Sequence, residues 1–174
     1  MKRGVIAGQK EHMPTIEEVY CKFGFVAEAA QLLETEFSTL LLKEDAMAQD
    51  LFDNPNPKRS RDILDKINKK TLGRLISESK SKIDSLDSLS ESLSVALNER
   101  NRLCHSFYLE HNLRLRSKDD SGRKIMMEDL ERMHVAILDA YKSVLLLSGI
   151  DLEKMAGSCG EIITDSLPNH LKLL

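Results

Sequence analysis

Side chains suited to phosphate chemistry gather in one short segment, which contains Arg100, Asn101 and His105. The planar fork of an arginine can donate two hydrogen bonds to a phosphate at once. A histidine titrates near neutrality and can take or give a proton. Asn101 can donate to a phosphoryl oxygen or orient the imidazole ring. Together these groups could cleave RNA without a metal, by activating a 2′-OH against the adjacent phosphate and protonating the leaving oxygen.

The spacing of the segment indicates how a helix would present these groups. At about 100° per residue, one polar stripe follows steps of three and four, and it comprises Asn98, Asn101, His105, Tyr108 and Asn112. Arg100 instead falls among the apolar positions, where its charge needs a partner or a route to water. His105 lies about 140° around the helix from Arg100, so one helix does not aim both at a common point. The pattern therefore predicts a site formed by two copies of this helix across a two-fold axis.

The elements that carry this segment are predicted to be helices, because apolar residues recur at steps of three and four through most of the chain. Thr15 can cap a first helix with Glu18 reaching back to it, and the proline-rich loop 53–57 interrupts the helical pattern. Short helices are expected around 63–67 and 72–76. The catalytic candidates fall on a long helix from about 85 to about 116.

The last long helix is predicted to begin near Ser121 and to stop at Gly149, a residue suited to a left-handed C-cap. Its core-facing stripe alternates steps of four and three, as in helices packed antiparallel in a bundle, and it comprises Met126, Leu130, Met133, Ile137, Ala140, Val144 and the polar Ser148. We therefore predict an all-α antiparallel bundle of about four main helices with short extra ones. Residues 1–14 would form an N-terminal tail, 15–150 the bundle, and 151–174 a C-terminal tail with short helical pieces.

Composition sets limits on the function. The 174 residues are 41% hydrophobic and 30% charged, with a net charge of −3, so any contact with nucleic acid must be local. Aromatic residues make up 5% and Trp is absent, which disfavours a stacking platform for single strands. Cys21, Cys104 and Cys159 are odd in number and far apart, which indicates free thiols in a cytoplasmic protein. The apolar runs are too short to cross a membrane.

No metal or cofactor site is predicted. His111 follows His105 by six residues, whereas two ligands on one helix face are four apart. The acidic cluster Glu128, Asp129 and Glu131, with Arg132 and His134, is typical of the hydrophilic side of a helix. The predicted site therefore comprises Arg100, Asn101 and His105 as catalytic groups, and its substrate-binding residues are Asn98, Arg102, Tyr108 and Asn112.

The sequence Arg100-Asn101-x-x-x-His105 resembles the Arg-x(4–6)-His signature of the HEPN superfamily, whose members often carry a polar residue directly after the arginine. The resemblance implies an all-α domain that dimerises in a helical bundle. It also implies a metal-independent endoribonuclease, which leaves 2′,3′-cyclic phosphate ends and acts as a toxin or in phage defence. RNA, a second copy of the chain and a protein antitoxin are the partners that it suggests.

The chain departs from one branch of that superfamily. Toxins paired with nucleotidyltransferase antitoxins typically place a Tyr two residues after the His, and the antitoxin modifies that Tyr. Here Phe107 holds that position and the tyrosine is displaced to Tyr108. This departure puts modification by such a partner in doubt.

Two other readings of the polar stripe stay open. A catalytically inactive HEPN-like module would bind RNA, a nucleotide or a protein through the same groove. A plain dimerisation protein would use the Asn and His residues as an interface. If these residues are purely structural, Arg100 pairs with Glu99 or with an acid on a neighbouring helix, and His105 lies hydrogen-bonded at the bundle surface.

Overall fold

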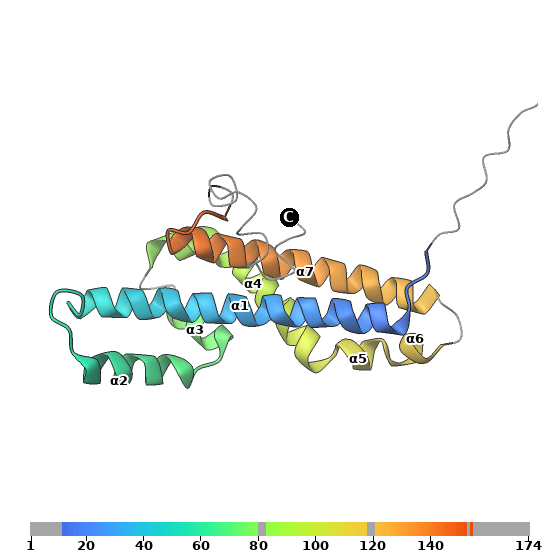
Figure 1. The fold of residues 1–174 in the computed structure, drawn as a ribbon, viewed down its shortest axis with the longest axis horizontal. Helices are drawn as coiled ribbons and strands as arrows, with labels where there is room; N and C mark the ends of the chain where they lie inside the picture. The colour runs from blue at the N-terminus through green and yellow to red at the C-terminus, as the bar shows by residue number, and fades with distance from the viewer. Residues whose placement is uncertain (1–11, 80–82, 118–120, 153, 155–174) are drawn as a thin grey trace, which may run out of the picture.

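The computed structural model describes residues 12–79, 83–117, 121–152 and 154. Within these ranges all regular secondary structure is helical, so the all-α class is confirmed. The elements, drawn in Figure 1, are α1 (Ile16–Ala48), α2 (Pro57–Asn68), α3 (Leu72–Ser79), η1 (Asp84–Leu89), α4 (Ser90–His105), α5 (Phe107–Glu110), α6 (Asn112–Arg116) and α7 (Ser121–Leu147).

The first helix starts as the sequence predicts. The Thr15 hydroxyl accepts a hydrogen bond from the backbone of Glu18 at 3.2 Å, and the Glu18 carboxylate accepts one from the backbone of Thr15 at 2.7 Å. This reciprocal capping box satisfies two backbone donors that the first turn leaves unpaired. The loop after α1 ends at Asn56, whose side chain caps α2, and Pro57 is the first residue of that helix.

Helices α1 and α7 lie side by side and run parallel (Figure 1). Lys22 on α1 contacts His134 on α7. Glu36, which lies later in α1, contacts Ser148, just after the end of α7. The prediction of antiparallel packing is therefore wrong for this pair. The reason is topological: α4, α5 and α6 return the chain to the end where α1 begins, so α7 starts beside the start of α1.

The core lies between α1, α4 and α7. All the apolar positions predicted for the last helix from Met126 to Val144 are buried, and Ser148 is half-buried. They face the buried stripe of α1, in which Val26, Leu33 and Phe37 are fully enclosed. The helices pack in this way because contact between their apolar stripes removes that apolar surface from water. Ile16, predicted to join the α1 stripe, is exposed at the first turn.

The predicted helix from 85 to 116 is not continuous. It begins as the 3-10 segment η1, and regular helix is interrupted again at Ser106 and at His111. At the first interruption the Ser106 hydroxyl donates to the carbonyl of Arg102 at 3.2 Å and contacts the Glu110 carboxylate at 2.8 Å. The Ser106 backbone N–H still donates to the Arg102 carbonyl at 2.9 Å, so the chain keeps its helical path across the break. The catalytic candidates therefore lie at the end of α4, whereas Tyr108 and Asn112 belong to α5 and α6.

The ends of the bundle agree with the predicted turn residues. Gly149 has a φ of 86°, in the left-handed region that favours glycine after a helix. Pro14, placed in the N-terminal tail by the sequence, is buried, and its carbonyl accepts a hydrogen bond from Arg123 at 2.7 Å. Pro14 thus packs on the bundle, whereas His12 and Met13 are exposed. Residues 1–11, 153 and 155–174 of the predicted tails lie outside the described residues.

Two observations concern the predicted location. None of the helices in the described part of the chain is both long enough and apolar enough to cross a membrane. Cys21 and Cys104 are exposed free thiols. The prediction of free thiols is therefore confirmed for these two cysteines. Cys159 lies outside the described residues. The cytoplasmic location itself stays a prediction.

Candidate functional site

The outer face of α4 carries three of the predicted site residues. Asn98, Asn101 and His105 are all exposed there, one turn apart along the helix. The opposite face of α4 packs into the core through Leu93, Ala96 and Leu103. The amphipathic pattern of α4 therefore turns the polar stripe toward solvent.

Arg100 is held at the side of this face. Its side chain is 24% exposed, and Nη2 donates to the Glu34 carboxylate on α1 at 3.0 Å. Nη1 donates to the side-chain oxygen of Asn101 at 3.1 Å. The expectation that Arg100 needs a partner is confirmed, and that partner is Glu34 on a neighbouring helix. Glu99 instead pairs with Arg102, at 3.2 Å.

His105 stands apart from Arg100 within one protomer. The imidazole is exposed, and it hydrogen-bonds with no side chain in the part of the chain that the structure describes. No hydrogen bond or ion pair among the described residues joins it to Arg100. This arrangement agrees with the angular separation expected on one helix.

The other two members of the polar stripe border a hollow next to the site. Tyr108 is half-buried and packs against Phe23 and Tyr20, with ring centroids 5.0 Å and 6.2 Å away. Asn112 is exposed. Tyr108, Asn112, Tyr20 and Arg116 line an open hollow of about 330 Å³. It offers aromatic rings, an amide and a guanidinium, which are the groups that bind a base and its phosphate.

Arg102, predicted to bind substrate, turns toward α7 instead. It forms a two-pronged ion pair with Asp129, with Nη1 and Nη2 at 3.1 Å and 2.5 Å from the two carboxylate oxygens. Its Nε donates to Glu110 at 2.8 Å. Because its donors already serve acidic partners, we leave Arg102 out of the proposed site.

Asp129 is the centre of a buried polar cluster. Its side chain is 3% exposed, and it accepts hydrogen bonds from Arg102, Arg132 and the ring of His111. Burial by itself would raise the pKa of Asp129, but the hydrogen bonds from Arg102 and His111 outweigh it and lower the pKa. Hydrogen bonds to Asp129 and then to Glu110 raise the pKa of Arg102. Asp129 and Arg102 therefore stay charged, and the cluster ties α4 and the turn at His111 to α7.

The sequence did not indicate this cluster. Asp129 and His134 were assigned to the hydrophilic side of α7, but both are buried. Their partners are distant along the chain: His111 and Arg102 for Asp129, and Lys22 for His134. Helical phasing offered one signal, because Asp129 is adjacent to Leu130 and Met133 on the inward side of α7.

Glu110, His111 and Asp129 bring three potential metal ligands within 4.8 Å of one another. The Arg102 guanidinium already bonds to both carboxylates, and Arg132 adds a second cation at Asp129. A divalent ion at this point would have to displace those charges. We therefore interpret the cluster as a structural ion-pair network.

Comparison of the chain with protein families, with curated proteins and with solved structures found no match.

Proposed function

We propose that the chain is a metal-independent endoribonuclease of HEPN type, active as a homodimer, with Arg100, Asn101 and His105 as its catalytic residues. One observation carries the proposal: the exposed face of α4 displays Asn101 and His105 to solvent, while Glu34 and Asn101 hold the Arg100 guanidinium at the side of this face. A cation, an amide and an imidazole along one open helix face can bind an RNA phosphate.

The proposed reaction is an in-line transfer within the RNA. His105 of one protomer removes the proton from a 2′-OH, and the 2′-oxygen forms a bond to the adjacent phosphorus. Arg100 and Asn101 donate hydrogen bonds to the phosphoryl oxygens, where negative charge develops. The bond to the 5′-oxygen breaks, and that oxygen takes a proton from His105 of the partner subunit. The products are a 2′,3′-cyclic phosphate and a 5′-hydroxyl.

The hollow beside α5 supplies a place for the rest of the substrate. Tyr108 and Tyr20 can stack on a base, and Arg116 can bind a neighbouring phosphate. Asn98 and Asn112 lie toward the two ends of the polar stripe and can contact the RNA backbone. This local binding surface fits a chain with a net charge of −3, because it needs no broad basic face.

The proposal also includes a role as a toxin or in phage defence, with a protein antitoxin as a partner. Phe107 stands where related toxins carry the Tyr that their antitoxins modify, and it is fully buried in the core. Tyr108 is half-buried within an aromatic cluster. An antitoxin for this chain would therefore act by covering the α4 face.

One observation favours a second candidate, an inactive HEPN-like module that binds RNA, a nucleotide or a protein. Glu34 already neutralises Arg100, so the free site carries less positive charge than its sequence suggests. In this alternative, ligand binding depends on Arg100 and no bond is broken.

The test uses purified chain, labelled single-stranded RNA and EDTA, with products resolved on a gel and their ends identified. We expect cleavage that survives EDTA and leaves cyclic phosphate ends. Arg100→Ala and His105→Ala should each reduce the rate by about 100-fold or more, as is typical of lost acid–base or phosphate-binding groups.

Arg61→Ala is the matched control, because Arg61 is an exposed arginine on α2, away from α4. It should cleave at the parent rate. Binding that weakens in Arg100→Ala, without turnover in the parent, would favour the inactive module. Equal cleavage by parent, Arg100→Ala and His105→Ala would end the case for catalysis at α4.

A further inference from the structure

The turn between α2 and α3 concentrates positive charge in a chain that is acidic overall. Residues 57–79, which comprise both helices, contain seven Lys and Arg residues against three Asp and Glu. The rest of the chain contains 18 basic and 25 acidic residues, so these two helices are positive although the whole chain has a net charge of −3. Four of the basic residues lie around the turn, and we call them the α2–α3 basic patch: Lys66, Lys69, Lys70 and Arg74.

Neighbouring acids offset only part of the charge of this patch. Lys66 and Lys69 are exposed, and they form no ion pair with any residue that the structure describes. Lys70 and Arg74 both bind the Glu78 carboxylate, at 2.5 Å and 2.7 Å. Hydrogen bonds from Lys70 and then from Arg74 lower the pKa of Glu78 to about 2, so this carboxylate stays charged at neutral pH. The patch therefore presents two free cations and two that share one acid.

The patch adjoins the polar stripe of α4. Helix α3 packs against α4 at Gly73, where an added Cβ would lie 3.2 Å from a methyl group of Leu97. Arg100 and Asn101 follow Leu97 by three and four positions, so they lie on the same side of α4, one turn further along. In Figure 1 the turn between α2 and α3 lies toward the middle of the bundle, whereas α2 begins at its outer end. Because Arg74 directly follows Gly73, the patch borders the proposed site.

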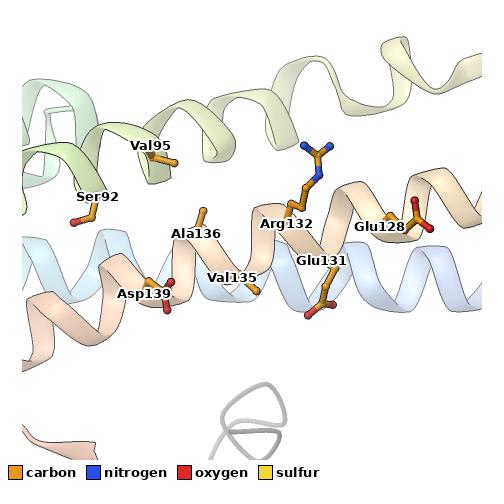
Figure 2. Close-up of a pocket in the computed structure, with 8 residues that line it drawn as sticks. All are labelled: Ser92, Val95, Glu128, Glu131, Arg132, Val135, Ala136 and Asp139. Atoms are coloured by element: carbon orange, nitrogen blue, oxygen red, sulfur yellow. The ribbon is translucent and has the colours of Figure 1, made fainter.

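The opposite side of the polar stripe is acidic. At about 100° per residue, Val95 points about 160° away from Leu97, with the stripe between them, and it lines an open groove between α4 and α7. The α7 wall of this groove, shown in Figure 2, carries three acidic residues: Glu128, Glu131 and Asp139. Arg132 also lines the groove, but its guanidinium is paired with Asp129. This wall repels phosphates, so an RNA strand bound at the stripe is drawn toward α3 instead.

We propose that the α2–α3 basic patch is a second RNA-binding surface, which holds the phosphate backbone of a single strand whose reacting phosphate lies at α4. Lys66 and Lys69 each contact a phosphate as point charges. Other phosphates of the strand compete with Glu78 for Lys70 and Arg74. Phosphate contacts carry no sequence information, so the patch lengthens the bound strand without choosing its bases. This inference rests on the proposed function and makes its substrate an extended single strand.

The test measures binding separately from cleavage. An oligouridine of about 12 nucleotides, made with 2′-O-methyl ribose so that it cannot be cleaved, is titrated with the full chain over a range of salt concentrations, and fluorescence anisotropy gives the Kd. Lys66→Gln/Lys69→Gln should weaken binding by about ten-fold at low salt, because two phosphate contacts are lost. The slope of log Kd against log salt should fall by about 1.4, since each contact with a single strand contributes about 0.7.

Lys58→Gln/Arg61→Gln is the matched control. It removes the same charge from exposed residues of α2, about two turns earlier and at the outer end of the bundle. At about 0.15 M salt, where distant charges are screened, it should bind within about two-fold of the parent. Glu78→Gln has the opposite expected effect: it releases Lys70 and Arg74 and should tighten binding by about three-fold. Loss of folding could not produce such a gain.

The outcomes separate the binding surface from the catalytic residues. Equal weakening by the patch variant and its control would show that net charge alone matters, and it would overturn the proposal, as would a parent that binds no RNA or a Glu78→Gln variant that binds no tighter. Patch-dependent binding by a chain that cleaves no unmodified RNA would support the patch and remove catalysis at Arg100 and His105. Cleavage that needs Arg100 and His105, with unchanged binding in the patch variant, would support the nuclease and overturn the patch. Circular dichroism confirms that each variant is folded.

Discussion

At the scale of single residues, the stability of the fold depends on the ion-pair network around Asp129. A carboxylate that is 3% exposed must be compensated by partners, and it has Arg102, Arg132 and His111. Burying charges costs free energy, and removing one partner leaves the others uncompensated. The network therefore stabilises the junction of α4, α6 and α7 even though its residues resemble surface residues in sequence.

Asp129→Ala should lower the free energy of unfolding by about 3–5 kcal/mol, because Arg102 and His111 lose the carboxylate between them. Urea denaturation followed by circular dichroism measures this change. Asp65→Ala is the matched control, since Asp65 is an exposed aspartate on α2, and it should stay within about 0.5 kcal/mol of the parent. Equal stability of both variants would contradict the structural role of the network.

The same carboxylate predicts a dependence of stability on pH. The pKa of Asp129 is lowered below its ordinary value of 3.8 in the folded chain, so the folded state holds the charged form more strongly than the unfolded state does. Its contribution is complete above that ordinary value, and it is lost as pH falls through the folded pKa.

Thermal melts at descending pH provide the measurement. The melting temperature of the parent should fall steeply below about pH 4. Asp129→Asn should start lower and fall less over the same range, since it lacks the titrating group. Glu110, whose pKa is also lowered by Arg102, remains in both proteins and accounts for part of the shared slope. Parallel curves would show that Asp129 does not titrate differently on folding.

At the scale of elements, the helix ends are set by local chemistry, and the breaks within the 85–116 segment are not. The Thr15 capping box joins residues three apart, so the sequence predicted it. The interruptions at Ser106 and His111 depend on packing: Phe107 is fully buried, and His111 turns inward to Asp129 on α7. The periodicity of the local sequence cannot indicate such distant partners.

Thr15→Ala should destabilise the chain by about 1 kcal/mol, because the backbone N–H of Glu18 loses its acceptor. Thr39→Ala is the control within the same helix. Thr39 is exposed, and its hydroxyl bonds only back to the carbonyl of Thr35, so its replacement should change stability by less than about 0.5 kcal/mol. The two values are compared by chemical denaturation, and a neutral Thr15→Ala would remove the energetic role of the cap.

At the scale of the whole molecule, the separation of Arg100 from His105 links activity to association. No hydrogen bond or ion pair among the described residues joins the two within a protomer. The proposed reaction takes its acid from the second copy of the chain. A change that separates the two copies can therefore alter catalysis without touching a catalytic group.

The RNA cleavage rate per protomer should fall on dilution below the dimer Kd. It should fall by about ten-fold or more once most protomers are monomeric, since acid and base then no longer meet. Gel assays over a dilution series, beside sedimentation equilibrium of the same samples, provide the comparison. A rate per protomer that is independent of concentration in a dissociating protein would show that one chain contains the complete site.

The sequence by itself determined the all-α class, the start of α1, the two ends of α7, the buried stripe of α7 and the exposed polar stripe on α4. These follow from helical periodicity and from caps that span three or four residues. Tertiary structure alone decided that α1 and α7 run parallel, that Glu34 holds Arg100, and that Arg102 belongs to a buried network with Asp129. Each of these depends on contacts between residues at least 27 positions apart in the chain, which are set by how the helices pack and not by the pattern along any one of them.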